Sequence, residues 1–264
     1  MPDPAKAMHA SRPGGWEIVR RNRAAMVSLG FLVALLVTAF VLPWFLPAAL
    51  KETSEASFLP PLTQADDGGL LHLCGTDVNG QDLFYRLLSG ARVSLGVGII
   101  GAIISLIIGT LYGMISGAAG GRTDAFMMRA IDVLYAVPRI LLIMIFIAAL
   151  DPYVTEWLDS ARLGCQARGW PFFEQLMRDA IPYSRLLVMI LSLGLVEWLT
   201  MARIVRGQVL VLRQMTFVTA ARAMGQSRWS ILVKHLLPNL ATVILTYLTL
   251  TIPTVILDES FLSF

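Results

Sequence analysis

The side chains that most often carry out catalysis are scattered in this sequence. The three histidines, His9, His72 and His235, lie far apart. The sequence has no GxxxxGK[ST] phosphate loop, no HExxH metal-binding helix and no GxSxG nucleophile elbow. Its hydrophobic segments offer no cluster of His, Cys or carboxylate side chains suited to a transition metal. We therefore predict neither a catalytic site nor a metal site.

Two charged residues stand out because they interrupt apolar segments. Arg139 falls within residues 133–150, and Glu197 falls within residues 186–202. A lone charge in hydrocarbon costs about 2.5 to 3.5 kcal/mol on insertion scales. Helical rise places the two residues at depths that differ by roughly 4 to 5 Å, which an arginine side chain can bridge. Two interpretations stay open: the residues form an intramembrane charge pair, or each faces a water-filled pathway.

The elements that carry these residues are hydrophobic helices. Of the 264 residues, 56% are hydrophobic and only 15% are charged, which lies outside the range of ordinary soluble domains. Residues 24–50, 93–121 and 236–257 carry no charge, and each segment exceeds the roughly 20 residues that a helix needs to cross a bilayer. With the weaker segments 133–150 and 186–202, the sequence predicts an all-α integral membrane protein with five spans.

The distribution of lysine and arginine predicts the orientation of the chain. Basic residues gather in residues 1–23 and 203–234, and the second of these segments contains no acidic residue. Because cytoplasmic loops collect positive charge, both segments are expected inside. Residues 1–23 then form a cytoplasmic lead-in, and residues 24–50 form the first span, with an outer loop to about residue 92. The core follows over residues 93–264, and the net charge of +3 needs no nucleic acid to explain it.

The predicted outer side has two further features. Residues 83–91 have an apolar face at helical spacing and predict a helix along the outer surface. Residues 151–184 form an outer insertion, for which we expect one or two interfacial helices. Its aromatic side chains, Trp157, Trp170, Phe172 and Phe173, are expected at the membrane boundary rather than around a ligand.

The two cysteines, Cys74 and Cys165, fall in the two predicted outer loops. Their shared side allows a disulfide, which we state as an expectation. Two unpaired thiols remain an equally open alternative, because two cysteines define no disulfide framework.

Glycines recur every four residues in the second span, at Gly109, Gly113, Gly117 and Gly121. This spacing puts them on one helix face, where they let another helix backbone approach closely. Tight static packing and a sliding surface are both compatible with the pattern.

A patterned basic stretch, "TAARAMGQSRWSILVKHLLPN", lies between two apolar segments. Thr216 is suited to cap a helix over residues 217–224, and Gly225 can end that helix in the left-handed conformation. Ser227 can then cap a second helix that runs into the fifth span. A DNA-binding helix-turn-helix has similar punctuation, but the flanking spans exclude entry into a groove. The alternatives are a docking site for another protein and an interfacial loop without a partner.

This stretch resembles the cytoplasmic loop of bacterial ABC importer permeases. That loop has the pattern EAA, a glycine four residues after the last alanine, and a basic helix that ends in HxxPN. The matching residues are Thr219-Ala220-Ala221, Gly225, and His235 to Asn239, with Thr219 where glutamate is usual. The stretches "GTDVNGQDLFYRLLSGARVSL", "MARIVRGQVL" and "ESFLSF" further resemble the C-type subunits of di- and oligopeptide permeases, with Gln81 replacing the usual arginine.

The resemblance implies the type I permease bundle and a transport subunit that is not itself an enzyme. It implies a second homologous permease, two ATP-binding subunits beneath the pair, and an extracytoplasmic peptide-binding protein. The permease would bind no cofactor directly, since ATP and Mg belong to the ATP-binding subunits. Residues 203–234 would be the cytoplasmic coupling loop. The positions carried over for ATPase coupling are Phe217, Thr219, Ala220, Ala221, Met224, Gly225, Ser227, His235 and Pro238.

Several alternatives accompany this interpretation. The same architecture could import nickel or another small solute, because the permease sequence separates these substrates poorly. A non-ABC channel or carrier would require several ionisable groups along a membrane path, whereas only Arg139 and Glu197 lie well inside predicted spans. The expected location is the bacterial cytoplasmic membrane, with membrane lipid as a partner. Members of the family continue after "ESFLSF" into a sixth span, so we expect a shortened chain of five.

Overall fold

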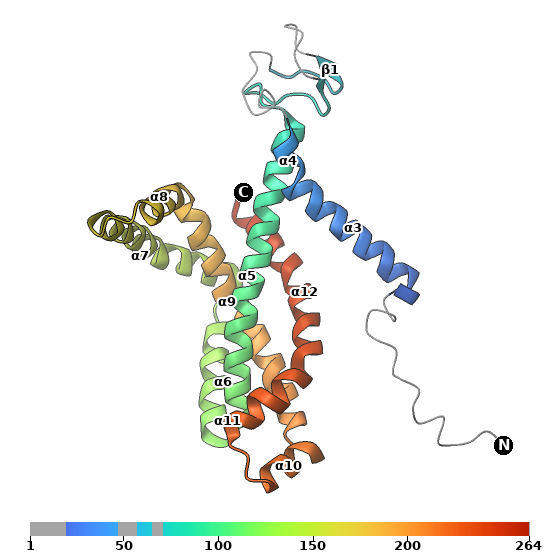
Figure 1. Ribbon diagram of the computed structural model, residues 1–264, viewed down its shortest axis with the longest axis vertical. Coiled ribbons are helices and arrows are strands. Elements are labelled where there is room, and N and C mark those ends of the chain that lie inside the picture. Colours follow the sequence, from blue (N-terminus) through green and yellow to red (C-terminus); the bar gives the residue numbers. More distant parts are fainter. Residues whose placement is uncertain (1–19, 47–56, 65–70, 264) are drawn as a thin grey trace, which may run out of the picture. The chain divides into compact units, whose positions relative to one another are not determined.

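The computed structural model describes residues 20–46, 57–64 and 71–263 (Figure 1). The predicted cytoplasmic lead-in over residues 1–23 therefore lies almost entirely outside the described residues. The chain divides into two compact units, Met1–Val93 and Ser94–Phe264.

Five helical segments of the described chain are long and apolar enough to cross a membrane. They are Arg23–Phe45, Leu83–Ala119, Arg139–Ala167, Pro171–Leu212 and Arg228–Ser263. This finding confirms the five predicted spans, although several of their boundaries differ from the predicted ones.

The first unit contains α3 (Arg23–Phe40), α4 (Leu42–Phe45) and a small antiparallel pair, β1 (Thr63–Gln64) and β2 (Leu71–His72). The Asn22 side chain accepts hydrogen bonds from the backbone N–H groups of Ala24 and Ala25 at the start of α3, as an N-cap does. In the same unit the buried imidazole of His72 lies 2.7 Å from a carboxylate oxygen of Asp82, whose other oxygen caps the start of the next helix.

The second predicted span is one continuous helix, α5 (Leu83–Ala119). The separate surface helix expected over residues 83–91 is therefore wrong, because no proline interrupts this stretch and the helix simply continues. The helix ends before Gly120, whose φ of +64° belongs to the left-handed region that favours glycine.

The predicted span over residues 133–150 is broken into two helices. α6 (Gly121–Tyr135) stops before Pro138, and α7 (Arg139–Ala167) starts immediately after it. Proline has no N–H to donate and restricts the residue before it, which explains the break. Arg139 consequently occupies the first position of α7.

The insertion predicted over residues 151–184 is helical almost throughout. α7 continues past Pro152 to Ala167, and a turn with Gly169 at φ +67° leads into α8 (Pro171–Ala180). A single 3-10 turn, η2 (Ile181–Tyr183), then leads into α9 (Ser184–Leu212). Figure 1 shows α7 and α8 side by side, extending sideways from α6, α9 and α12.

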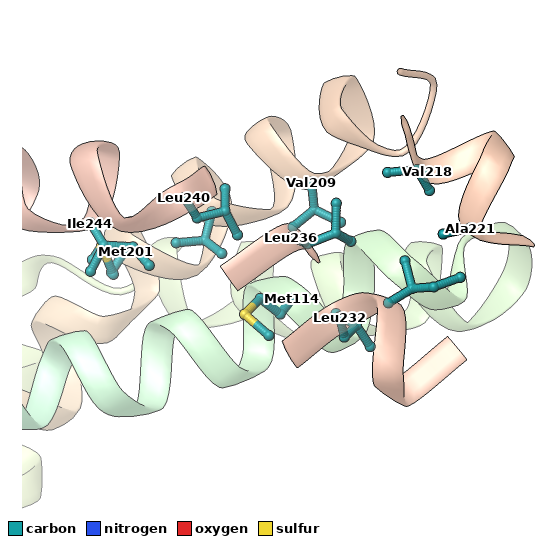
Figure 2. Close-up of a cluster of buried hydrophobic side chains, with 11 residues drawn as sticks. Met114, Met201, Val209, Val218, Ala221, Leu232, Leu236, Leu240 and Ile244 are labelled. Atoms are coloured by element: carbon teal, nitrogen blue, oxygen red, sulfur yellow. The ribbon is translucent and has the colours of Figure 1, made fainter. Parts of the chain in front are cut away.

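The chain then forms α10 (Thr216–Ala223), α11 (Arg228–Ile231), a π-helical turn η3 (Leu232–Leu236) and α12 (Leu237–Ser263). The second unit has two buried apolar clusters. The one used below, which we call the inner cluster, joins side chains from α5, α9, α10 and the α11–α12 segment (Figure 2). Its buried members are Met114, Met201, Val205, Val209, Val218, Ala221, Ile231, Leu232, Leu236, Leu240 and Ile244.

Candidate functional site: a short helix clamped between two spans

α10 is a two-turn helix with one face buried and the other exposed. Val218 and Ala221, three residues apart, are fully buried in the inner cluster, and Figure 2 shows both side chains directed toward it. Residues three apart share a helix face, so this spacing explains why α10 packs on the inner cluster through these two side chains. The same cluster contains residues of α9 and α12, so one apolar core connects α10 with both spans that flank it in the sequence.

Four large apolar side chains in α10 and its neighbouring turns are exposed. Met224 is 72% exposed and Trp229 is 62% exposed, and Met215 and Phe217 are also exposed. We call these four residues the docking face. Large apolar side chains gathered on an otherwise polar, basic loop are typical of a surface that another protein covers.

The start of α10 differs by one residue from the prediction. Met215, with an extended backbone, is the N-cap, and Thr216 is the first helical residue. The carbonyl of Met215 accepts hydrogen bonds from the N–H groups of Val218 and Thr219, at 3.1 and 3.2 Å. Thr216 therefore gives no side-chain cap, because the helix begins one residue too early for its hydroxyl to do so.

Gly225 ends α10 in the conformation predicted for it, with φ +78°. Its N–H donates to the carbonyl of Arg222 at 2.9 Å, and the N–H of Gln226 donates to the carbonyl of Ala221 at 3.2 Å. These two bonds form a Schellman motif, which satisfies carbonyls at a helix end. The predicted cap of the following helix is also confirmed, since the hydroxyl of Ser227 accepts from the N–H of Ser230 at 3.2 Å.

His235 joins the turn to the start of the last span. Its Nε2 lies 2.8 Å from the side-chain oxygen of Gln226, next to Gly225. The side-chain amide of Asn239 donates to the carbonyl of His235 at 2.6 Å. The π-helical turn Leu232–Leu236 precedes Pro238, and such wider turns occur where a proline disturbs the helical ladder. The HxxPN residues thus shape the junction between α11 and α12.

A second connection ties the C-terminal half of α9 to the start of α6 and the end of α5. Arg206 donates two hydrogen bonds to the carboxylate of Asp124, one of them 2.6 Å from Nη2 to Oδ2. Ser116 donates to the same carboxylate, and Nη1 of Arg213 donates to the carbonyl of Gly117 at 3.0 Å. The hydrogen bonds from Arg206 hold the pKa of Asp124 below its ordinary value. The sequence prediction missed this pair, because its members lie 82 residues apart.

The glycines of α5 pack against the backbone of α9. A Cβ atom placed on Gly113 would lie 2.5 Å from the carbonyl oxygen of Ala202, and one on Gly109 would lie 2.8 Å from that of Trp198. A Cβ atom on Gly117 would lie 2.8 Å from Cβ of Val209. Gly121, the fourth glycine of the series, has open space around it. Three of the four predicted positions therefore make close helix contacts of the kind that small residues permit.

Comparison with known proteins identifies the family of this chain. The family model described as the binding-protein-dependent transport system inner membrane component matches residues 109–264, more than half of the chain. The chain belongs to this family. A second model, described as the N-terminal TM domain of oligopeptide transport permease C, matches residues 15–61.

Curated relatives support the same conclusion. The oligopeptide transport system permease protein OppC of Haemophilus influenzae is 35% identical over 92% of this chain and 67% of its own length. The dipeptide transport system permease protein DppC of Bacillus subtilis is 35% identical over 94% of this chain and 66% of its own length. OppC of Escherichia coli K12 is 34% identical over 94% and 72%. The chain thus spans about two thirds of the length of these relatives.

These findings confirm the family and the helical permease fold predicted from the residues. The protein is a multi-pass inner-membrane permease subunit, a non-catalytic component of a transport system that works with a binding protein.

The permease also carries a cluster of three charges among its spans. Arg139 at the start of α7 contacts the carboxylates of Glu197 in α9 and Asp258 in α12, with 3.0 Å between Nε and the Asp258 oxygen. The structure thus brings together the two residues singled out in the sequence and adds a third. Asp258 was missed because it lies just beyond the uncharged segment 236–257, although α12 continues to Ser263.

The structure has Cys74 and Cys165 as free cysteines, and Cys165 lies within α7 rather than in a loop. The two residues belong to separate units of the chain, so the disulfide expected between them stays a prediction. The expectation used only a shared side of the membrane, whereas a disulfide needs alpha carbons within about 7 Å of each other and a suitable geometry.

Proposed function

We propose that this chain is one of two membrane-spanning subunits of an ATP-driven importer of di- and oligopeptides, and that α10 is its coupling helix. Support for the peptide substrate comes from the relatives, whose names assign them to oligopeptide and dipeptide transport. The observation that carries the coupling role is the two-faced packing of α10, buried through Val218 and Ala221 and exposed at the docking face.

The proposed assembly contains a second homologous permease, two ATP-binding subunits on the α10 side, and an extracytoplasmic peptide-binding protein. ATP and Mg would be held by the ATP-binding subunits. In this arrangement the N-terminus is cytoplasmic, because residues 1–23 and 203–234 carry the basic residues.

The inner cluster gives α10 a mechanical connection to the spans. A push on α10 is transmitted through Val218 and Ala221 to Val209 of α9 and Leu240 of α12, since all four side chains lie in one close-packed core. Arg206 and Arg213 extend the connection to the turn between α5 and α6. ATP can drive transport through this route only if the outward- and inward-facing states bind the ATP-binding subunits with different affinity.

The docking face suggests how the contact is made. Its side chains are apolar, and burial of one such side chain contributes about 1.5 to 3 kcal/mol. Thr219, at the position where related permeases have glutamate, carries no charge, and its hydroxyl lies 3.4 Å from the carbonyl of Met215 in its own helix turn. The proposed contact therefore depends on shape and apolar burial more than on an ion pair, and we expect it to depend weakly on salt.

Reconstitution of the whole transporter tests the proposal. The permease should co-purify with the ATP-binding subunits, and vanadate-sensitive ATP hydrolysis should rise when binding protein and peptide are added. Peptide uptake should be insensitive to excess nickel. Met224→Gln should weaken co-purification and uptake together, whereas Met224→Leu, which keeps the apolar surface, should preserve both. Solute transport by the permease alone, without ATP, would instead identify a carrier.

A further inference from the structure

The second half of α7 and all of α8 form a helical hairpin, residues 151–180, which we call the side arm. α7 and α8 lie side by side, and the backbone N–H of Trp170 closes the turn between them on the carbonyl of Cys165 at 3.0 Å. Figure 1 shows that this pair extends sideways from α6, α9 and α12 instead of running along them. The side arm therefore projects beyond the footprint of its own bundle.

The side arm lies at the end of α9 that is far from α10. α9 has 29 residues and at 1.5 Å per residue is roughly 43 Å long, enough to cross the bilayer. α8 is joined to its first residue by the single turn Ile181–Tyr183, and α10 follows its last residue closely. A structure that leaves the bundle sideways at this point must lie close to the membrane surface opposite α10.

The exposed side of α8 is aromatic. Phe172 is 73% exposed, and Phe173 and Leu176 are also exposed on the same helix face. The ring of Phe173 contacts those of Trp170 and Phe172, with centroid distances of 5.9 and 5.5 Å. The partly buried residues Met177 and Ala180 border this apolar face, and the polar residues Glu174, Gln175, Arg178 and Asp179 lie on the other side of the helix. Such a helix, with separate apolar and polar faces and little overall hydrophobicity, is typical of one that lies in the interface.

The α7 part of the side arm also exposes apolar side chains. Tyr153 and Trp157, four residues apart, are both exposed. Together with Val154, Leu191 of α9 and the polar residues Glu156 and Ser160, they line an open hollow of about 620 Å³ at the root of the side arm. Four of its six lining residues are apolar or aromatic, which suits contact with an acyl chain. This hollow is an observation independent of the α8 face.

The net charge of the side arm indicates what kind of surface it can bind. The side arm carries five acidic residues, Asp151, Glu156, Asp159, Glu174 and Asp179, against the three basic residues Arg162, Arg168 and Arg178. Its net charge is therefore −2, which does not favour attraction to anionic headgroups. Two of the arginines are already engaged, since Arg168 stacks on Trp170 at 5.8 Å and Arg178 pairs with Glu174 at 2.8 Å. Binding must therefore depend on apolar and aromatic burial.

We propose that the side arm binds a lipid surface: its aromatic face lies in the headgroup and acyl boundary of the leaflet opposite α10. The hollow beside Tyr153 and Trp157 takes lipid acyl chains. Trp and Tyr are enriched at this depth because their rings are apolar with one polar edge. The attachment needs no anionic lipid and is insensitive to salt.

Spin labelling of the complete transporter in lipid nanodiscs tests this proposal. In a background with Cys74→Ser and Cys165→Ser, one nitroxide is placed by Leu176→Cys on the aromatic face. A matched label is placed by Arg178→Cys, which lies across the helix on an exposed polar position. The ratio of collision rates with oxygen and with a water-soluble nickel complex should be severalfold higher at position 176 than at 178. It should be the same in zwitterionic and anionic nanodiscs.

Three outcomes would overturn the proposal. Equal ratios and free nickel access at both positions would place the side arm in water. Loss of access at position 176 only after the binding protein is added would make this face a protein docking surface. A label at 176 shielded from both reagents would place it against the partner permease.

A second measurement serves if the labelled variants fail to fold. The quenching of tryptophan fluorescence by brominated lipid is then compared between the native chain and the Trp170→Phe variant. Unchanged quenching after the loss of Trp170 would contradict the proposed depth.

Discussion

Arg206 in α9 donates two hydrogen bonds to Asp124 in the first turn of α6, so that one span is held to the helix that follows another. The carboxylate is largely buried and also accepts a hydrogen bond from Ser116. α10 begins four residues after the end of α9. Arg206 therefore belongs to the span that leads directly into the element that we propose as the coupling helix.

Asp124→Asn should lower the stability of the isolated permease by about 1.5 to 3 kcal/mol at neutral pH, because it removes a charge-assisted pair. The pKa of Asp124 is lowered in the folded protein, chiefly by hydrogen bonds from Arg206. The stabilisation is therefore complete above the ordinary carboxyl pKa of 3.8 and is lost as pH falls through the lower folded value. The melting-temperature gap between wild type and variant should stay constant from pH 7 to about pH 5 and shrink below about pH 4.

Asp132→Asn is the matched control for this measurement. Asp132 also lies in α6 and pairs with an arginine of α9, Arg203, at 2.6 Å, but its side chain is 64% exposed. Exposed ion pairs contribute about 0 to 1 kcal/mol. An equal loss of stability in both variants would show that the buried clamp has no special role.

The glycine contacts predict opposite effects for two substitutions in the same helix. Gly113→Ala places a Cβ atom 2.5 Å from the carbonyl oxygen of Ala202 and 3.0 Å from the backbone nitrogen of Arg206, so α5 and α9 must separate. The expected loss is about 1 to 3 kcal/mol. Gly96→Ala meets nothing within 4 Å and should be neutral or stabilising by up to about 1 kcal/mol through helix propensity. Thermal unfolding in detergent measures both, and equal melting temperatures would contradict the close contact.

Local features of this fold could be read from the sequence, whereas long-range contacts could not. Gly225 and Ser227 were assigned correctly because a left-handed glycine and a serine cap act on neighbouring backbone groups. The partners Asp124 and Arg206 were missed because nothing local links two residues on different helices. The α5 boundary was misplaced because an apolar face at helical spacing does not show whether a surface helix continues into a span.

The cluster around Arg139 illustrates the same limit. The pairing of Arg139 and Glu197 could be predicted from their estimated depths in the membrane, since both residues interrupt apolar segments. Asp258 is separated from Arg139 by 119 residues and follows an uncharged run. Because α12 continues beyond the uncharged segment 236–257, it carries a charged residue, Asp258, that a search for uncharged segments leaves out.

Arg139→Met should be the most harmful single change in this cluster, because it leaves two carboxylates without their shared cation. Removing one partner of a buried ion pair costs about 3 to 5 kcal/mol. Glu197→Gln should cost less, since Asp258 still contacts Arg139. A double-mutant cycle on unfolding free energies should give a coupling of at least about 0.5 kcal/mol between positions 139 and 197. Strictly additive losses would mean that the two side chains do not stabilise each other.

Gly225 is the position where coupling can be disturbed without disturbing the spans. Its φ of +78° is strained for any residue with a Cβ atom, most of all a β-branched one, yet a Cβ atom there meets nothing within 4 Å. The cost of Gly225→Val is therefore one of backbone conformation, about 1 to 2 kcal/mol, and it falls on the Schellman motif that ends α10. The chain should still insert and pair with its partner permease, because the inner cluster keeps every side chain.

Peptide uptake and peptide-stimulated ATP hydrolysis should fall together in Gly225→Val, because α10 is tilted relative to the ATP-binding subunits. Gly225→Ala should lose less, since alanine tolerates the left-handed region better than valine does. Both variants are compared with wild type at equal expression in the reconstituted transporter, with co-purification of the partner permease as the folding control. If the loop only tethers α9 to α12, both variants should transport normally. Retention of more than about half of wild-type uptake by Gly225→Val, with a normal folding control, would rule out the coupling role of this turn.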